Sequence, residues 1–173
     1  MLCTAHYDSP LGDILLAADE IGLTGLWFAG QKYYPAQLPG LAEGSCTVLE
    51  QAVRWLDQYF AGNRPDFTPA VHLVGTQYQV AVWESLLTIP YGKTVSYRAI
   101  GAITAERLGK ERFSARAVGA AVGRNPISVI VPCHRVVGAD GSLTGYAGGL
   151  NRKERLLTLE GGLCLPTCLK EKG

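Results

Sequence analysis

The first 28 residues of the chain carry apolar runs too short for helices, separated by residues typical of turns. The runs are "CTAHY", "DILLAAD" and "GLTGLWF", and the segments before the second and third are "DSPLG" and "DEIG". Short apolar runs bounded by Gly, Pro and Asp indicate strands joined by tight turns. The pattern therefore predicts a meander of short antiparallel strands.

Apolar residues then recur at helical spacing, on one face of a helix that contains Val48, Ala52, Trp55, Leu56 and Tyr59. Ser45 is expected to cap this helix, and Gly62 to end it. The next segment, "GNRPDFTPAVHLVG", has no periodicity and holds two prolines. We interpret it as a linker, which gives an N-terminal domain over residues 1–74.

The second half of the chain has mainly helical patterns. Thr76 can cap a helix that stops at "IPYG", and "TVSYRAIGAITAERLG" is followed, after a polar turn, by a helix that Ser114 can cap. Two short helices joined by a polar turn are typical of a helix-turn-helix. The run "NRKERLLTLE" predicts a further helix, which ends at Glu160. The overall expectation is an α+β fold, with a small sheet domain before a helical domain.

The helix after Ser114 has an unusual composition. From Ala115 to Gly123, Arg116 is the only long side chain, and the others are Ala, Gly and Val. Each glycine lowers the stability of a helix by about 1 kcal/mol relative to alanine. Glycines at two positions of one helix therefore indicate a packing or binding role for its narrow surface. One explanation is tight packing against another helix. The other is entry into a nucleic-acid groove, with Arg116 reaching in; a minor groove about 6 Å wide would require such a narrow surface.

Charge is unevenly distributed along a chain whose net charge is only +1. Residues 1–92 carry a net charge of −6, whereas residues 93–135 carry +6. A neutral protein with one basic segment fits a localised contact with a polyanion, although a solvated charged face would give the same pattern.

The cysteines and the first residues of the chain indicate the cellular compartment in which the protein is expected. Five cysteines at irregular spacing argue against a disulfide framework, and they form no familiar zinc spacing with the three histidines. No apolar run approaches the roughly 20 residues of a membrane span, and "MLCTAHYDSPLG" does not resemble a signal peptide. We expect a cytoplasmic protein with reduced thiols, no membrane contact and no metal or other cofactor.

The stretch "VIVPCHRVVG" contains the candidate chemistry, because Cys133 and His134 are adjacent in it. The apolar run at 127–131 predicts a buried extended segment, and Pro132 stiffens the approach to the cysteine. Burial raises a thiol pKa, so a reactive Cys133 needs a base. Neighbours in an extended chain point to opposite faces, so we expect any relay between Cys133 and His134 to use a bend or a bridging water.

A histidine base also needs an orienting carboxylate. Glu160 is a candidate, because a helix C-terminus is an unfavourable place for a negative charge that has no other use. A buried structural cysteine beside an incidental histidine is the simpler alternative.

Several motifs, in order, resemble one family. "RAVGAAVGRNPI", "PCHRV" and "GYAGG", with the preceding "SY" pair, are similar to the C-terminal domain of the O(6)-alkylguanine-DNA alkyltransferases, also called methylated-DNA–protein-cysteine methyltransferases. The resemblance runs from about Gly75 to Gly162. More loosely, "SPLG" and "YFAG" fit a small N-terminal sheet domain of ribonuclease-H-like shape. The resemblance implies a winged-helix-like domain over residues 75–163, followed by a tail at 164–173.

The resemblance also implies an activity and a role for individual residues. The family repairs DNA by moving an alkyl group from guanine O6, and less readily from thymine O4, to its own cysteine, in one irreversible step. It makes Cys133 the acceptor, with its assisting residues at His134, Glu160 and Asn125. It implies DNA contacts by Tyr97, Arg98, Arg116, Gln79 and Ala139, and a base pocket lined by Val136, Tyr146 and Ala147.

In that scheme, His134 acts through a water, Glu160 orients the histidine, and Asn125 braces the turn before the acceptor segment. Tyr97 helps to rotate the nucleotide out of the duplex, and Arg116 fills the vacated stack from the minor groove. Flipping is needed because the alkyl carbon cannot be reached inside a duplex. The expected partner is double-stranded alkylated DNA, bound by a monomer that can cluster along it.

Two alternatives remain at this stage. An alkyltransferase-like protein that binds lesions without catalysis would share the helix-turn-helix but lack the acceptor thiol, and the presence of Cys133 argues against it. A cysteine hydrolase using Cys133 and His134 would turn over acyl or amide substrates repeatedly.

Overall fold

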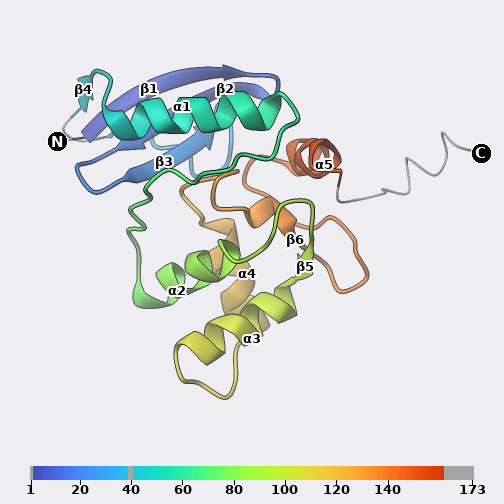
Figure 1. Ribbon diagram of the computed structural model, residues 1–173. Helices are drawn as coiled ribbons and strands as arrows, with labels where there is room; N and C mark the ends of the chain where they lie inside the picture. Colours follow the sequence, from blue (N-terminus) through green and yellow to red (C-terminus); the bar gives the residue numbers. More distant parts are fainter. Residues whose placement is uncertain (1, 39–40, 162–173) are drawn as a thin grey trace, which may run out of the picture.

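The computed structural model describes residues 2–38 and 41–161, and it confirms the α+β fold (Figure 1). The N-terminal sheet has the order β3-β2-β1-β4. Its strands are β1 (Leu2–Ser9), β2 (Gly12–Ala18), β3 (Leu23–Phe28) and β4 (Leu41–Glu43). The first three form the expected antiparallel meander, whereas the short β4 pairs in parallel with β1.

Helix α1 (Thr47–Phe60) lies along this sheet and buries Leu49, Ala52, Trp55, Leu56 and Tyr59. The prediction that Ser45 caps it is wrong. The N-cap position belongs to Cys46, which makes no side-chain cap hydrogen bond. Ser45 lies one residue too early, and its hydroxyl donates to Oε1 of Glu50 at 2.8 Å instead.

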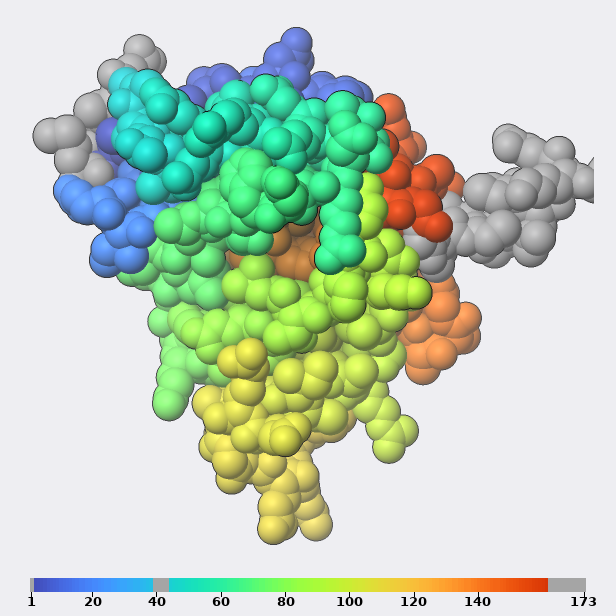
Figure 2. All heavy atoms as spheres, in the orientation of Figure 1, coloured from blue at the N-terminus to red at the C-terminus, as the bar shows by residue number. Residues whose placement is uncertain are grey.

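The second layer contains three helices, α2 (Gln77–Leu86), α3 (Tyr97–Arg107) and α4 (Ala115–Gly123). As predicted, Thr76 caps α2, in a full capping box with Gln79, and Ser114 caps α4. Helices α3 and α4 pack together as the helix-turn-helix requires. The connection between them, residues 108–114, protrudes at the bottom of the molecule in Figures 1 and 2.

The segment after α4 is buried but is not extended, so that part of the prediction is wrong. Residues 127–131 form a compact turn, with Val131 N donating to Ile127 O at 3.0 Å and Val129 at φ 71°. The 3₁₀ turn η1 (Cys133–Arg135) follows, and then β6 (Val136–Val137), which pairs in parallel with β5 (Val95–Ser96). Local turns, the Asn125 side chain and a single bridge to β3 satisfy the amides of this segment, in place of a full strand pairing.

Strand β3 connects the two halves of the molecule. Leu26 N donates to Pro126 O at 2.9 Å, and Ser128 N donates to Leu26 O at 3.2 Å. Leu23 and Ile127 are fully buried in one continuous apolar core. The N-terminal sheet therefore supports the segment that leads to Cys133. Within residues 2–38 and 41–161, no helix combines the length and apolar character that a membrane crossing needs.

The caps give a direct test of this local structure. Thr76→Ala removes a hydroxyl that accepts from Gln79 N at 3.1 Å, and it should lower the free energy of unfolding by about 1 kcal/mol. Ser45→Ala, at the position that is not a cap, should cost less. Urea unfolding followed by circular dichroism measures both, and equal losses would contradict the assigned caps.

Candidate functional site

Cys133 lies at the bottom of a cavity of about 360 Å³. Its side chain is almost fully buried at the first residue of turn η1. Burial raises the pKa of the thiol; a hydrogen bond with the Asn125 side chain and the charge of Lys153 partly oppose this effect. The resting thiol is therefore protonated, and it needs a base to become a nucleophile.

His134 is positioned to supply that base indirectly. Its Nε2 lies 2.5 Å from Oε2 of Glu160, and both side chains are fully buried. Burial lowers the pKa of His134, which favours the neutral imidazole. A hydrogen on Nε2 then bonds the carboxylate, and Nδ1 carries the free lone pair. Nδ1 is buried and has no hydrogen-bond partner among the described residues, as the expected bridging water would require.

Glu160 is held as a carboxylate by its neighbours. Nε of Arg135 donates to Oε1 at 2.8 Å, and Gly92 N donates to the same oxygen at 3.2 Å. Although burial opposes ionisation, the hydrogen bonds with His134 and Arg135 and the charge of Arg135 lower the pKa of Glu160 to about 2. The carboxylate therefore stays charged and fixes the histidine ring.

Asn125 fixes the turn that carries the cysteine. Its Nδ2 donates to Val131 O at 2.8 Å and to Ile127 O at 3.4 Å, and its Oδ1 accepts from Ile127 N at 3.0 Å. One buried amide thus satisfies backbone groups on both sides of the turn. This position agrees with the bracing role that the resemblance implies.

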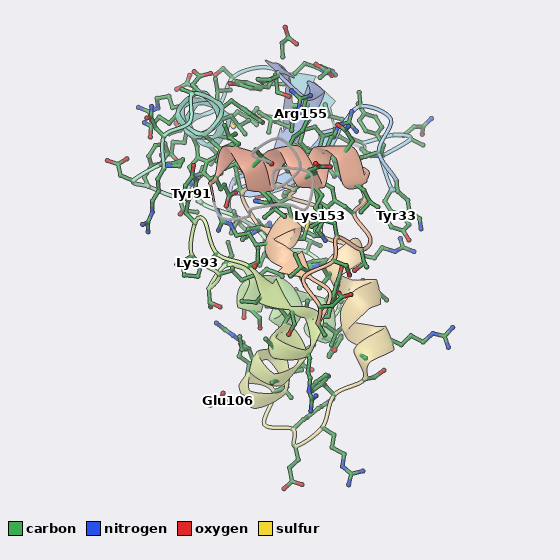
Figure 3. All side chains as sticks on the ribbon, turned by 90° about the vertical axis from the view of Figure 1, so that its right-hand side faces the viewer. Tyr33, Tyr91, Lys93, Glu106, Lys153 and Arg155 are labelled. Carbon is green, nitrogen blue, oxygen red and sulfur yellow. The ribbon has the colours of Figure 1, made fainter. Side chains whose placement is uncertain are left out.

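Lys153 is a site residue that the sequence reasoning missed. It lies on α5 (Leu150–Leu159) (Figure 3). Its side chain is fully buried, and Nζ donates to Thr144 O at 3.0 Å and to Gly145 O at 3.1 Å. Burial lowers its pKa to about 8. A signal existed in the sequence: Lys153 shares a helical face with Leu156, Leu157 and Glu160, so a lysine lies on an apolar stripe.

The cavity wall comes from both halves of the chain. The helix α4 residues Gly119, Ala120 and Gly123 line it, together with Tyr97, Tyr146 and Ala147. The N-terminal loop contributes two residues that the sequence did not indicate, Lys32 and Tyr33. Lys32 N donates to Ala147 O at 2.9 Å, and the Tyr33 ring lies under the Arg124 guanidinium at 3.9 Å from its centroid.

The other residues predicted to contact DNA or to line the base pocket differ in their exposure and contacts. Tyr97 donates to Thr144 O at 2.9 Å, and Arg98, Arg116 and Ala139 are exposed. Oε1 of Gln79 accepts from Thr76 N in the capping box. Val136 is fully buried in β6 and is not among the residues that line the cavity. Their roles toward DNA stay predictions.

The glycines of α4 can now be interpreted. A Cβ placed on Gly119 or Gly123 would meet nothing within 4 Å. Tight packing against another helix therefore does not explain them. The slim face is open and borders the cavity above Cys133, which favours the groove-binding interpretation.

Comparisons with known proteins identify the family of the chain. The family described as "6-O-methylguanine DNA methyltransferase, DNA binding domain" matches residues 77–162, and the family described as "6-O-methylguanine DNA methyltransferase, ribonuclease-like domain" matches residues 2–73. The chain belongs to the O(6)-methylguanine-DNA methyltransferase family. Among the side chains that the structure describes, no three His, Cys, Asp or Glu residues are grouped to hold a metal ion.

Individual relatives cover nearly the whole chain. The methylated-DNA–protein-cysteine methyltransferase of Mycobacterium leprae is 50% identical over 92% of this chain and 93% of its own. The crystal structure of Mycobacterium tuberculosis O6-methylguanine methyltransferase matches with a TM-score of 0.77 and 45% identity, over 96% of each chain. The structure of Mycobacterium tuberculosis OGT in complex with DNA matches with a TM-score of 0.75 and 45% identity, over 92% of this chain and 91% of that one.

The buried carboxylate predicts a stability change with a defined pH dependence. Glu160→Gln leaves Arg135 buried without its counter-ion and should lower the free energy of unfolding at pH 7 by about 3–5 kcal/mol. The folded-state pKa of Glu160 is depressed from 4.5 to about 2. Its ionic stabilisation is therefore complete above pH 4.5 and is lost as the pH falls toward 2.

Urea unfolding at a series of pH values measures this effect. Stability of the variant should fall less steeply below pH 4.5 than that of the wild type. Glu84→Gln is the control, because Glu84 forms only an exposed pair with Arg107 at 3.4 Å. Parallel pH curves for wild type and Glu160→Gln would refute the assigned ionisation.

Proposed function

We propose that the protein repairs DNA as a methylated-DNA–protein-cysteine methyltransferase, moving the alkyl group of O(6)-alkylguanine to Cys133. The observation that carries the proposal is the buried thiol at the bottom of a cavity, beside a histidine whose Nδ1 is free and whose Nε2 is held by Glu160. Family membership and the methyltransferase names of the relatives support the same reaction.

The reaction begins with proton removal from Cys133. Through a bridging water, the proton passes to Nδ1 of His134, and Glu160 stabilises the imidazolium that forms. The sulfur attacks the alkyl carbon, the bond from that carbon to guanine O6 breaks, and its electron pair stays on the guanine. The guanine anion takes up one proton and the His134 imidazolium gives one up, so the net change replaces the thiol hydrogen by the alkyl group and leaves neutral guanine.

The product explains why the protein acts once. A thioether has no acyl carbon that water could attack, unlike the intermediate of a cysteine hydrolase. None of the groups described around Cys133 would break a carbon–sulfur bond. Each molecule therefore repairs one lesion, with thymine O4 lesions as poorer substrates.

DNA must present the base outside the duplex, because the thiol is buried below the cavity mouth. The slim face of α4 enters the minor groove, and the exposed Arg116 occupies the stack that the flipped nucleotide leaves. Tyr97 acts at the nucleotide's backbone turn, while Arg98, Gln79 and Ala139 contact the strands. Tyr146 and Ala147 line the base pocket.

The organisation and setting of the protein are part of the proposal. Residues 1–74 and 75–163 form two domains, consistent with separate family matches at 2–73 and 77–162. The protein works as a cytoplasmic monomer on double-stranded DNA, without a cofactor. Residues 164–173, including Cys164 and Cys168, were expected to form a tail and lie outside the described residues.

Mass spectrometry tests the reaction directly. After incubation with duplex DNA that contains O(6)-methylguanine, the tryptic peptide 125–135 should gain one CH2 unit per protein molecule, with no further turnover. Cys133→Ser should still bind the duplex and should show no transfer.

The same experiment separates the alternatives. Binding without the mass gain would identify a lesion-binding protein, and repeated cleavage of acyl substrates would identify a hydrolase. Methyl transfer by Cys133→Ser would show that another residue is the acceptor.

The open glycine face predicts opposite effects on stability and binding. Gly119→Ala should raise the free energy of unfolding by up to about 1 kcal/mol, because its Cβ meets nothing and alanine favours the helix. DNA affinity should fall, because the added methyl group occupies the face that approaches the groove. Urea unfolding and fluorescence anisotropy with a labelled duplex measure the two effects. Unchanged affinity would argue against α4 as the groove-entering element.

A further inference from the structure

One donor to Glu160 comes from the other half of the molecule. The hydroxyl of Tyr59, the penultimate residue of α1, donates to Oε2 of Glu160 at 2.6 Å across 101 residues of sequence. The same Oε2 lies 2.5 Å from Nε2 of His134. Figure 1 shows the C-terminal end of α1 beside α5. Two donors thus share one carboxylate oxygen, and one of them belongs to the N-terminal domain.

Packing holds Tyr59 rigidly at this position. Its side chain is fully buried, its ring stacks on Trp55 with centroids 5.0 Å apart, and it meets Tyr91 edge-on at 6.2 Å. Packing alone would be served equally well by phenylalanine. A buried phenol aimed at a charged carboxylate indicates a use for the hydroxyl itself.

We propose that Tyr59 is a positioning residue of the alkyl-transfer site, whose hydroxyl fixes Oε2 of Glu160 and limits the negative charge that this oxygen presents to His134. The inference rests on the proposed function of Cys133 and His134. It gives the N-terminal domain a part in the chemistry beyond supporting the fold.

The physical argument concerns competition at one oxygen. A carboxylate oxygen that accepts a second strong hydrogen bond is a weaker acceptor for the first. With Tyr59 in place, Oε2 orients the imidazole but pulls less strongly on its Nε2 hydrogen. His134 then stays neutral until the thiol proton arrives. Without the hydroxyl, Oε2 would stabilise the imidazolium in the resting protein and reduce the fraction of molecules that hold a free base.

Other charged and titratable groups face this pair and must remain constant in any test. They are Arg135 on η1, Tyr91 in the connection after α2, Tyr146 in the loop before α5, and Lys153 on α5. Arg135 and Lys153 lower the pKa of His134, whereas Glu160 raises it. Tyr59→Phe removes one oxygen atom and leaves all of these groups in place.

A matched control is a second hydrogen bond from a tyrosine hydroxyl to a carboxylate, made by Tyr7 of β1. Tyr7 donates from its hydroxyl to Oδ1 of Asp57, also on α1, at 2.7 Å. Tyr7→Phe therefore removes the same kind of hydrogen bond, from a phenol to a carboxylate, away from the acceptor site.

The decisive measurement is nuclear magnetic resonance of 15N-histidine-labelled full-length protein at pH 7. The three histidines give a simple spectrum, in which His134→Gln assigns the buried one. In Tyr59→Phe, the Hε2 resonance of His134 should move downfield as its bond to Oε2 shortens. The acid limb of the methyl-transfer rate should also move to higher pH, by about half a unit to one unit. Tyr7→Phe should change neither.

An Hε2 resonance in Tyr59→Phe at the same position as in Tyr7→Phe would overturn the proposal. If Tyr59→Phe does not fold, a measurement on the wild-type protein still tests whether the two donors share Oε2. The protected hydroxyl proton of Tyr59 should show a cross-peak to Hε2 of His134, and its absence beside a visible Hε2 signal would refute the shared oxygen. Failure of the wild type to take up a methyl group would instead refute the proposed function.

Discussion

The buried carboxylate of Glu160 is the interaction on which the rest of the site depends. It accepts from Tyr59, Gly92, His134 and Arg135, which belong to three separate segments of the chain. A buried charge is tolerated only when its hydrogen bonds are satisfied. The fold must therefore bring α1, the connection after α2, turn η1 and the end of α5 together, and this requirement also orders the histidine ring.

A second constraint acts on the segment between α4 and η1. The Asn125 side chain hydrogen-bonds to the backbone of this turn, and the backbone of Leu26 on β3 hydrogen-bonds to it as well. Val129 has a positive φ of 71°, which is unfavourable for a β-branched residue. Such a conformation persists only where the surroundings fix it. The N-terminal half of the chain thus contacts both the segment that leads to Cys133, through Leu26, and the carboxylate of Glu160, through Tyr59.

The sequence predicted the elements whose signals are local. Capping by Thr76 and Ser114 and the strand meander follow from residue types at fixed spacing. The unfavourable place of Glu160 at a helix end pointed to its contact with His134, which the structure shows. Contacts between distant segments were not predictable: nothing near Tyr59 indicates a partner 101 residues away. The turn at 127–131 was missed because an apolar run carries no periodicity that separates a strand from a buried turn.

The arrangement suits a protein that reacts once. A turnover enzyme must release its product and restore its nucleophile, whereas an alkylated Cys133 needs neither. The thiol of Cys133 can therefore be almost fully buried. Burial raises its pKa and keeps it unreactive toward molecules that do not fill the cavity. Reactivity then depends on a base that is preorganised before the lesion arrives, because no later cycle can correct a misplaced histidine. The hydrogen-bond donors around Glu160 fix the histidine in advance. The hydroxyl of Tyr59, from the N-terminal half of the chain, is one of these donors.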